Sequence, residues 1–217
     1  MSDWVTLAGD LWAPYLSAGR LDYDRLAADV DTQAWVRWIA HADLDRAGRD
    51  EQLAFYLNAY NLLVIHQAVR RLRRRSDWPG VLTFGDKLRF FGLERHRVAG
   101  RAINLYTLEN SIIRRRFREP RIHFALNCAS SSCPPLPERL FVAETLDADL
   151  ERLTRRFLES DAVAYNAATH TLTVSRIFRW YRKDFQPSVP AYIARYRDVP
   201  TDVRVVYQRY DWSLNRA

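Results

Sequence analysis

Residues 53–65, LAFYLNAYNLLVI, are the strongest structural signal in this chain of 217 residues. If this stretch is a helix, it is apolar on nearly every side, and such a helix is buried on all of its faces. Asp50 lies before it as an N-cap, and the arginines of residues 70–75 follow it, where cations complement the helix macrodipole. We therefore expect a long helix at the centre of the domain.

Two asparagines interrupt the apolar surface of this helix, Asn58 at its middle and Asn61 further along. A buried amide is tolerated when its hydrogen bonds are made inside the protein. Asn58 is therefore expected either to orient a catalytic imidazole or to tie down a neighbouring loop.

The segments around the central helix alternate between helices and short strands. Helical spacing predicts helices over residues 4–17, 26–41 and 146–159, and another that begins with Thr107 as its cap. Alternation and turn residues predict a short helix over 86–91, hairpins over 95–105 and 162–174, and strands over 122–128 and 203–207. Because no strand–helix unit repeats, we expect an α+β fold, a single domain over residues 1–217 whose central helix packs against short antiparallel strands.

Composition limits the partners of the chain. Its net charge is +7, and Lys87 and Lys183 are its only lysines, so nearly all of its positive charge is carried by arginine. The arginine clusters fall in the last turns of predicted helices, which argues against a nucleic-acid interface. No stretch approaches the ~20 apolar residues of a membrane span, and the beginning of the chain lacks the pattern of a leader. We expect a soluble cytoplasmic protein, or an exported one if a leader has been removed.

A second stretch, PRIHFALNCASSSCPPL at residues 120–136, carries the candidate chemistry. Cysteine catalysis needs a thiolate, which an imidazole or backbone N–H groups stabilise. Cys128 suits this better than Cys133, because residues 129–132 have free backbone N–H groups whereas Cys133 precedes two prolines. Two alternatives remain open: Cys128 is a small buried hydrophobe, or the two cysteines form a disulfide or a metal site.

His123 is the nearest candidate base for Cys128. In a regular strand the two residues would face opposite sides, so they meet only if the strand ends or bulges before Cys128. Otherwise the base comes from His66, His96 or His41.

Glu109 lies in the first turn of the helix that we expect after Thr107. It either complements the helix macrodipole or orients the catalytic histidine as the third member of a triad.

Several motifs in this order resemble the family catalogued as domain of unknown function 547: LAFYLNAYN at residues 53–61, TLEN at 107–110, PRIHFALNC at 120–128 with SCPPL after it, and IFRWYRKDF at 177–185. The resemblance covers about residues 4–185 and leaves 186–217 as a C-terminal extension. It implies that Asn58, Glu109 and Cys128 are typical positions of the family, whereas Asn110 stands where members commonly have histidine. It further implies that many bacterial relatives are exported, and the layout is similar to papain-like and transglutaminase-like hydrolases.

These features predict a cysteine-dependent hydrolase or acyltransferase acting on an amide, peptide or thiol conjugate. Cys128 would be the nucleophile, His123 the base, Glu109 or Asn58 the orienting group, and the amides of residues 129–132 the oxyanion donors. The competing hypothesis is a non-catalytic domain that binds a peptide or small molecule, or serves as a scaffold. We expect no cofactor and no metal, and a small-molecule or peptide partner rather than a membrane or nucleic acid.

Overall fold

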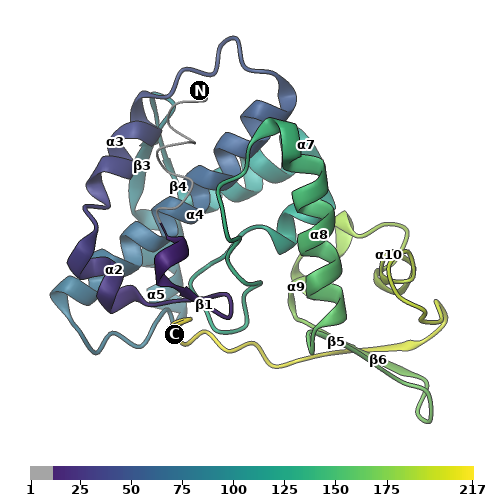
Figure 1. Cartoon of the computed structure of the whole chain (residues 1–217). Helices are drawn as coiled ribbons and strands as arrows, with labels where there is room; N and C mark the ends of the chain where they lie inside the picture. The colour runs from purple at the N-terminus through teal and green to yellow at the C-terminus, as the bar shows by residue number, and fades with distance from the viewer. Residues whose placement is uncertain (1–11) are drawn as a thin grey trace.

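The computed structural model describes residues 12–217, arranged around helix α4, Arg49–Arg74. Every residue from 53 to 69 is buried, so the predicted central helix is confirmed. Its N-cap is Gly48 rather than Asp50, and the Glu51 carboxylate accepts a hydrogen bond from the Gly48 N–H at 2.7 Å. Figure 1 shows α4 crossing the middle of the molecule.

Two helices, α2 (Tyr23–Asp29) and α3 (Gln33–His41), pack on α4 where a single helix over 26–41 was predicted. The helix breaks because the chain extends at Val30 and Thr32 turns inward, its hydroxyl lying 2.8 Å from His66 Nδ1 of α4. Most of the predicted helix over 4–17 lies outside the described residues. Its end is instead a short 3-10 turn, η1 (Ala13–Tyr15), followed by strand β1 (Leu16–Ser17), which pairs with β2 (Arg20–Leu21).

The middle of the chain contains the predicted short helix and the first hairpin. Helix α5 (Phe84–Lys87) continues into a π-helical segment, η2 (Leu88–Leu93), and β3 (Arg95–Val98) pairs with β4 (Arg101–Asn104) in an antiparallel ladder. The helix expected after Thr107 begins earlier, at α6 (Leu105–Thr107), because the Asn104 side chain caps it. It continues through a second π-helical segment, η3 (Leu108–Arg114), into α7 (Arg115–Phe117).

The predicted strand over 122–128 is wrong. The segment is buried, but it forms a 3-10 helix, η4 (Pro120–Phe124), followed by an irregular loop. Side chains rather than a neighbouring strand satisfy its backbone: Asn61 donates to the Ala125 carbonyl at 2.9 Å and accepts from the Asn127 N–H at 2.9 Å. An extended conformation is therefore unnecessary for burial, and the expected alternation of faces does not apply here.

The last part of the chain builds a smaller layer beside α4. Its helices are η5 (Ala143–Thr145), the predicted α8 (Leu146–Glu159), α9 (Ile177–Trp180), η6 (Arg182–Asp184) and α10 (Val189–Ile193). The predicted second hairpin forms as β5 (Val163–Asn166) and β6 (Thr171–Val174), and the predicted strand β7 (Arg204–Tyr207) adds to β6 in parallel. After β7 the chain runs back under the molecule toward β1, where it ends (Figure 1).

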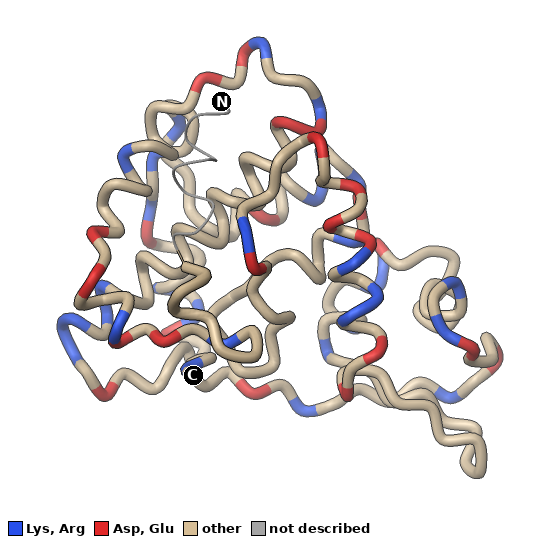
Figure 2. Tube along the Cα trace, in the orientation of Figure 1, with Lys and Arg blue, Asp and Glu red and all other residues tan. Residues whose placement is uncertain are grey.

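The architecture is α+β, rich in helix, with small two- and three-stranded sheets, so the predicted fold class is confirmed at this level. Between residues 12 and 217 no helix combines the length and hydropathy needed to cross a bilayer. Figure 2 shows lysine and arginine interspersed with aspartate and glutamate along the helices, most clearly on α8.

Candidate functional site

A cavity of about 700 Å³ opens where α4, η2, η3, the loop after η4 and the C-terminal segment meet. Three of the predicted site residues line it, Glu109, His123 and Cys128. The returning C-terminal segment closes one wall with Tyr210 and Trp212, which form an aromatic cluster with Trp180.

His123 is bound by a carboxylate that sequence reasoning did not single out. Its Nε2 lies 2.7 Å from Asp184 Oδ2, and Arg114 binds the same carboxylate through Nε at 2.8 Å and Nη2 at 3.1 Å. Burial opposes the charge of Asp184, but the hydrogen bonds from His123 and Arg114 prevail and lower its pKa to about 2. Asp184 is therefore an ionised acceptor at neutral pH, which fixes Nε2 of His123 as the donor.

The imidazole of His123 is itself held neutral. Burial lowers its pKa, against the attraction of Asp184 and Glu109. With the proton on Nε2, Nδ1 is the ring nitrogen left to accept a proton, and it makes no hydrogen bond within the described structure. The ring stacks on Tyr181 with centroids 4.0 Å apart, which fixes its plane.

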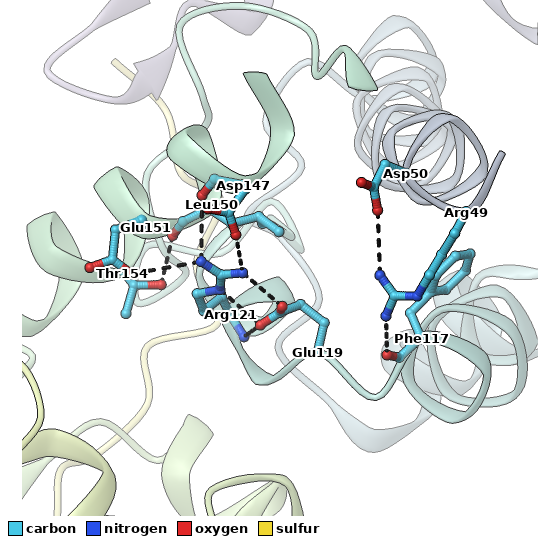
Figure 3. A network of polar contacts seen from close by, with 9 residues as sticks. All are labelled: Arg49, Asp50, Phe117, Glu119, Arg121, Asp147, Leu150, Glu151 and Thr154. Atoms are coloured by element: carbon cyan, nitrogen blue, oxygen red, sulfur yellow. Dashed lines mark hydrogen bonds and ion pairs between the residues drawn. The ribbon is translucent and has the colours of Figure 1, made fainter. Parts of the chain in front are cut away.

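Arg121 anchors the short helix that carries His123. Its guanidinium binds Glu119 at 2.9 Å and reaches Asp147 at the start of α8 at 2.7 Å, as Figure 3 shows. These ion pairs join the N-terminal end of η4 to the start of α8. The position of His123 is therefore set from outside the cavity as well as by Asp184 within it.

Glu109 is placed differently from the prediction that it orients histidine. Its Oε2 accepts from the Tyr60 hydroxyl at 3.0 Å, and its Oε1 accepts from the Tyr181 hydroxyl. Burial raises the pKa of both tyrosines well above its ordinary value, and the charge of Glu109 adds to the shift, so both hydroxyls remain donors. The carboxylate that binds His123 is that of Asp184, not Glu109.

Asn58 lies away from the cavity. Its side chain donates to the Phe141 carbonyl at 2.8 Å and accepts from the Phe141 N–H at 2.9 Å. Of the two roles expected for Asn58, the structure shows the second: its side chain fixes the loop at Phe141 and contacts no imidazole.

The other histidines proposed as bases also lie elsewhere. His66 pairs with Thr32 at 2.8 Å, His96 with Gln67 at 2.9 Å, and His41 with the Arg37 carbonyl at 2.8 Å. Among the expected bases, His123 alone lines this cavity.

The two cysteines are joined to each other by a disulfide on the wall of the cavity. The prediction that Cys128 is a free nucleophile is therefore wrong for this form of the protein. The Tyr210 hydroxyl lies 3.3 Å from Cys128 Sγ and 3.2 Å from Cys133 Sγ, and Ser130 Oγ lies 3.0 Å from Cys128 Sγ. The backbone N–H of Cys128 points at Cys133 Sγ, 2.8 Å away.

The expected oxyanion donors are mostly occupied. The N–H of Ala129 donates to Asn127 Oδ1 at 2.8 Å, that of Ser131 to the Ser213 carbonyl at 2.8 Å, and that of Ser132 to the Asp211 carbonyl at 3.2 Å. The prediction is therefore wrong for these three amides: Asn127 takes that of Ala129, and the C-terminal segment pairs with the cysteine loop and takes those of Ser131 and Ser132. No group of three or more His, Cys, Asp or Glu side chains within residues 12–217 is arranged to hold a metal ion.

Comparison with known proteins locates the chain in one family of sequences. A family model described as "Protein of unknown function, DUF547" matches residues 44–158. The match includes α4, Glu109, His123 and both cysteines, but ends before Asp184. No curated protein and no solved structure matches the chain, so the similarity to papain-like enzymes stays a prediction.

Proposed function

We propose that this chain, which belongs to the DUF547 family, is in its reduced form a thiol hydrolase or acyltransferase acting on an amide, peptide or thiol conjugate. The observation that carries the proposal is the pair of His123 and Asp184 on the same cavity as Cys128. A neutral imidazole held by an ionised carboxylate is the arrangement that activates a nucleophile in cysteine and serine hydrolases.

The first step is opening of the disulfide. Two molecules of a small thiol, or one dithiol, reduce the bond and leave as the corresponding disulfide, and Cys128 and Cys133 each gain a proton. The hydroxyls of Tyr210 and Ser130, which already lie within 3.3 Å of Cys128 Sγ, would then stabilise its thiolate.

In the proposed acyl transfer, the remaining groups of the cavity each have one role. His123 Nδ1 takes the proton of Cys128, whose sulfur forms a bond to the substrate carbonyl carbon. The amine or thiol of the substrate leaves with the proton that His123 returns. Water or a second acceptor then attacks the thioester, and its proton passes to His123 while Cys128 departs. Asp184 keeps the ring oriented and stabilises its protonated form.

Two groups are suited to stabilise the oxyanion. The backbone N–H of Cys128 and the hydroxyl of Tyr210 both point at the disulfide sulfurs. Once the Cys128 sulfur has bonded to the carbonyl carbon it is no longer a thiolate, so the single Tyr210 proton that stabilised it is free to turn to the oxyanion together with the Cys128 N–H. They take the place of the amides that the C-terminal segment occupies.

The test is the reaction of Cys133→Ser, which leaves Cys128 unpaired, with p-nitrophenyl acetate. We expect a stoichiometric burst of p-nitrophenolate and an acetyl group on Cys128 by peptide mass mapping. Cys128→Ser, which keeps the other thiol, is the matched control and should show neither. Equal acetylation of Cys128 in Cys133→Ser and in Cys133→Ser/His123→Asn would contradict the proposal, because the histidine would have no part in it.

The second candidate is a binding pocket without catalysis, and the disulfide favours it. A disulfide removes the nucleophile and fixes the cavity wall, which is a structural role. In that case Cys128→Ala/Cys133→Ala keeps its ligand affinity, and Cys133→Ser forms no acetyl-enzyme under the conditions above.

A further inference from the structure

Two charged side chains of the cavity form no ion pair within the described chain, and they carry opposite charges. Glu109 binds only tyrosine hydroxyls, and Lys87 lies with Nζ 3.8 Å from the centroid of the Trp212 ring. Both are half-buried and both line the cavity. Half-buried charges without a counter-ion are costly unless a ligand supplies one, so this pair points to the ligand.

The surroundings of Glu109 suit a cation. Each carboxylate oxygen accepts one tyrosine O–H, and a carboxylate has about four acceptor positions, so each oxygen can accept one more donor. Tyr60, Tyr181 and Tyr210 add aromatic surface around it. Carboxylate and aromatic rings together are what an alkylammonium group binds.

Arg114, a cation that interacts with Glu109, is already engaged elsewhere. Arg114 feels the charge of Glu109, but its guanidinium N–H groups bind Asp184 at 2.8 and 3.1 Å and Asn110 at 2.6 Å. Its face lies over the Tyr181 ring. It therefore offers Glu109 no direct hydrogen bond.

The surroundings of Lys87 suit an anion. An ammonium has three donors, and Lys87 directs its charge at an aromatic face with no acceptor from residues 12–217. It stands at the end of α5, beside the exposed Phe84 and Leu88. A ligand carboxylate that enters past Phe84 and Leu88 would give the Lys87 ammonium a counter-ion.

We infer that the cavity binds a short peptide with both termini free, its ammonium at Glu109 and its carboxylate at Lys87. The volume of about 700 Å³ is typical of a small-ligand site, and the aromatic walls from Trp180 and Phe91 provide space for side chains. The inference rests on the proposed function in taking the peptide for the substrate, but the binding itself requires no free thiol.

The experiment is calorimetric titration of the disulfide form with three peptides: Ala-Phe-Ala with free termini, its N-acetyl form and its C-terminal amide. We expect the free peptide to bind and each cap to weaken binding about tenfold or more, the loss of one charged hydrogen bond. Glu109→Gln should weaken the free peptide and the amide but leave the N-acetyl peptide as it was. Lys87→Gln should weaken the free and N-acetyl peptides and leave the amide unchanged.

Lys183→Gln is the matched control, since Lys183 is the other lysine, exposed on η6 and absent from the cavity lining. It should bind all three peptides as the unmodified protein does. The inference is overturned if capped and free peptides bind alike, if each variant weakens all three equally, or if no peptide binds at millimolar concentration. Because these titrations use the oxidised protein, failure of Cys128 acetylation leaves their result intact, and the reverse also holds.

Discussion

Helix α4 borders two polar regions that differ in how completely their hydrogen bonds are made. On one side, Asn58 and Asn61 are buried, and each donates to one backbone carbonyl and accepts from one backbone N–H; we call such groups, engaged at both nitrogen and oxygen and closed to any ligand, saturated. On the other side, Glu109, Lys87 and the Nδ1 of His123 line the cavity, and each can still form at least one more hydrogen bond. Saturated polar groups hold the fold, whereas unsaturated groups mark where a ligand or proton is received.

The largest effect is expected on the saturated side. Asn61→Ala removes the partners of the Ala125 carbonyl and the Asn127 N–H, both in a buried loop. Two orphaned backbone groups should lower the free energy of unfolding by about 3 kcal/mol. Urea denaturation monitored by tryptophan fluorescence measures the change. Asn110→Ala, at a half-buried position beside the cavity, is the control and should cost under about 1 kcal/mol; equal losses in the two variants would erase the contrast.

A smaller effect, with a pH signature, is expected at Asp184. Its pKa in the folded protein is about 2, below the ordinary 3.8, so its stabilisation is present above pH 4 and is lost as pH falls through 2. Asp184→Asn should therefore lower unfolding free energy by about 2 kcal/mol at neutral pH, and the two proteins should converge as pH falls from 4 toward 2. Urea midpoints measured at several pH values test this. A gap that is constant with pH would show that the carboxylate charge contributes nothing.

The smallest stability effect is expected at Glu109, on the unsaturated side. In Glu109→Gln one tyrosine still donates to the amide oxygen and the other can accept from its NH₂, so the free energy of unfolding should fall by less than about 1 kcal/mol. We expect this variant to be nearly as stable as the unmodified protein while its peptide binding changes. A loss as large as that of Asn61→Ala would place Glu109 among the residues that hold the fold.

Much of the fold could be predicted from local patterns. The apolar run around Asn58 required a buried helix, α8 had a clean amphipathic period, and the Ala99-Gly100 turn between β3 and β4 adopts the positive φ values of 44° and 77° that a tight hairpin favours. The segment after Pro120 could not be predicted, because its apolar residues fit a strand or a helix equally well. The conformation depends on Asn61, more than sixty positions away in the sequence. Its side-chain amide makes the backbone hydrogen bonds that a neighbouring strand would otherwise make.

The sequence predicted which types of residue the candidate site contains, but not which side chains bind each other. His123, Glu109 and Cys128 do share one cavity. Asp184 was not singled out because it follows Arg182 and Lys183, and a carboxylate among charged neighbours is usually a surface residue. Two signals were available: its place in the motif IFRWYRKDF and its position directly before the buried Phe185. Tyr210 and Lys87 reach the cavity only through the return of the C-terminal segment and the turn of α5, contacts that no local pattern encodes.

Activation of Cys128 by His123 and Asp184 is measured by the thiol pKa of Cys128, from the pH dependence of its alkylation by iodoacetamide in Cys133→Ser. We expect a midpoint well below the ~8.5 of an ordinary thiol, and a rise toward that value in Cys133→Ser/His123→Asn and Cys133→Ser/Asp184→Asn. A midpoint near ~8.5 that neither substitution moves would contradict the account, since the imidazole would then have no influence on the sulfur.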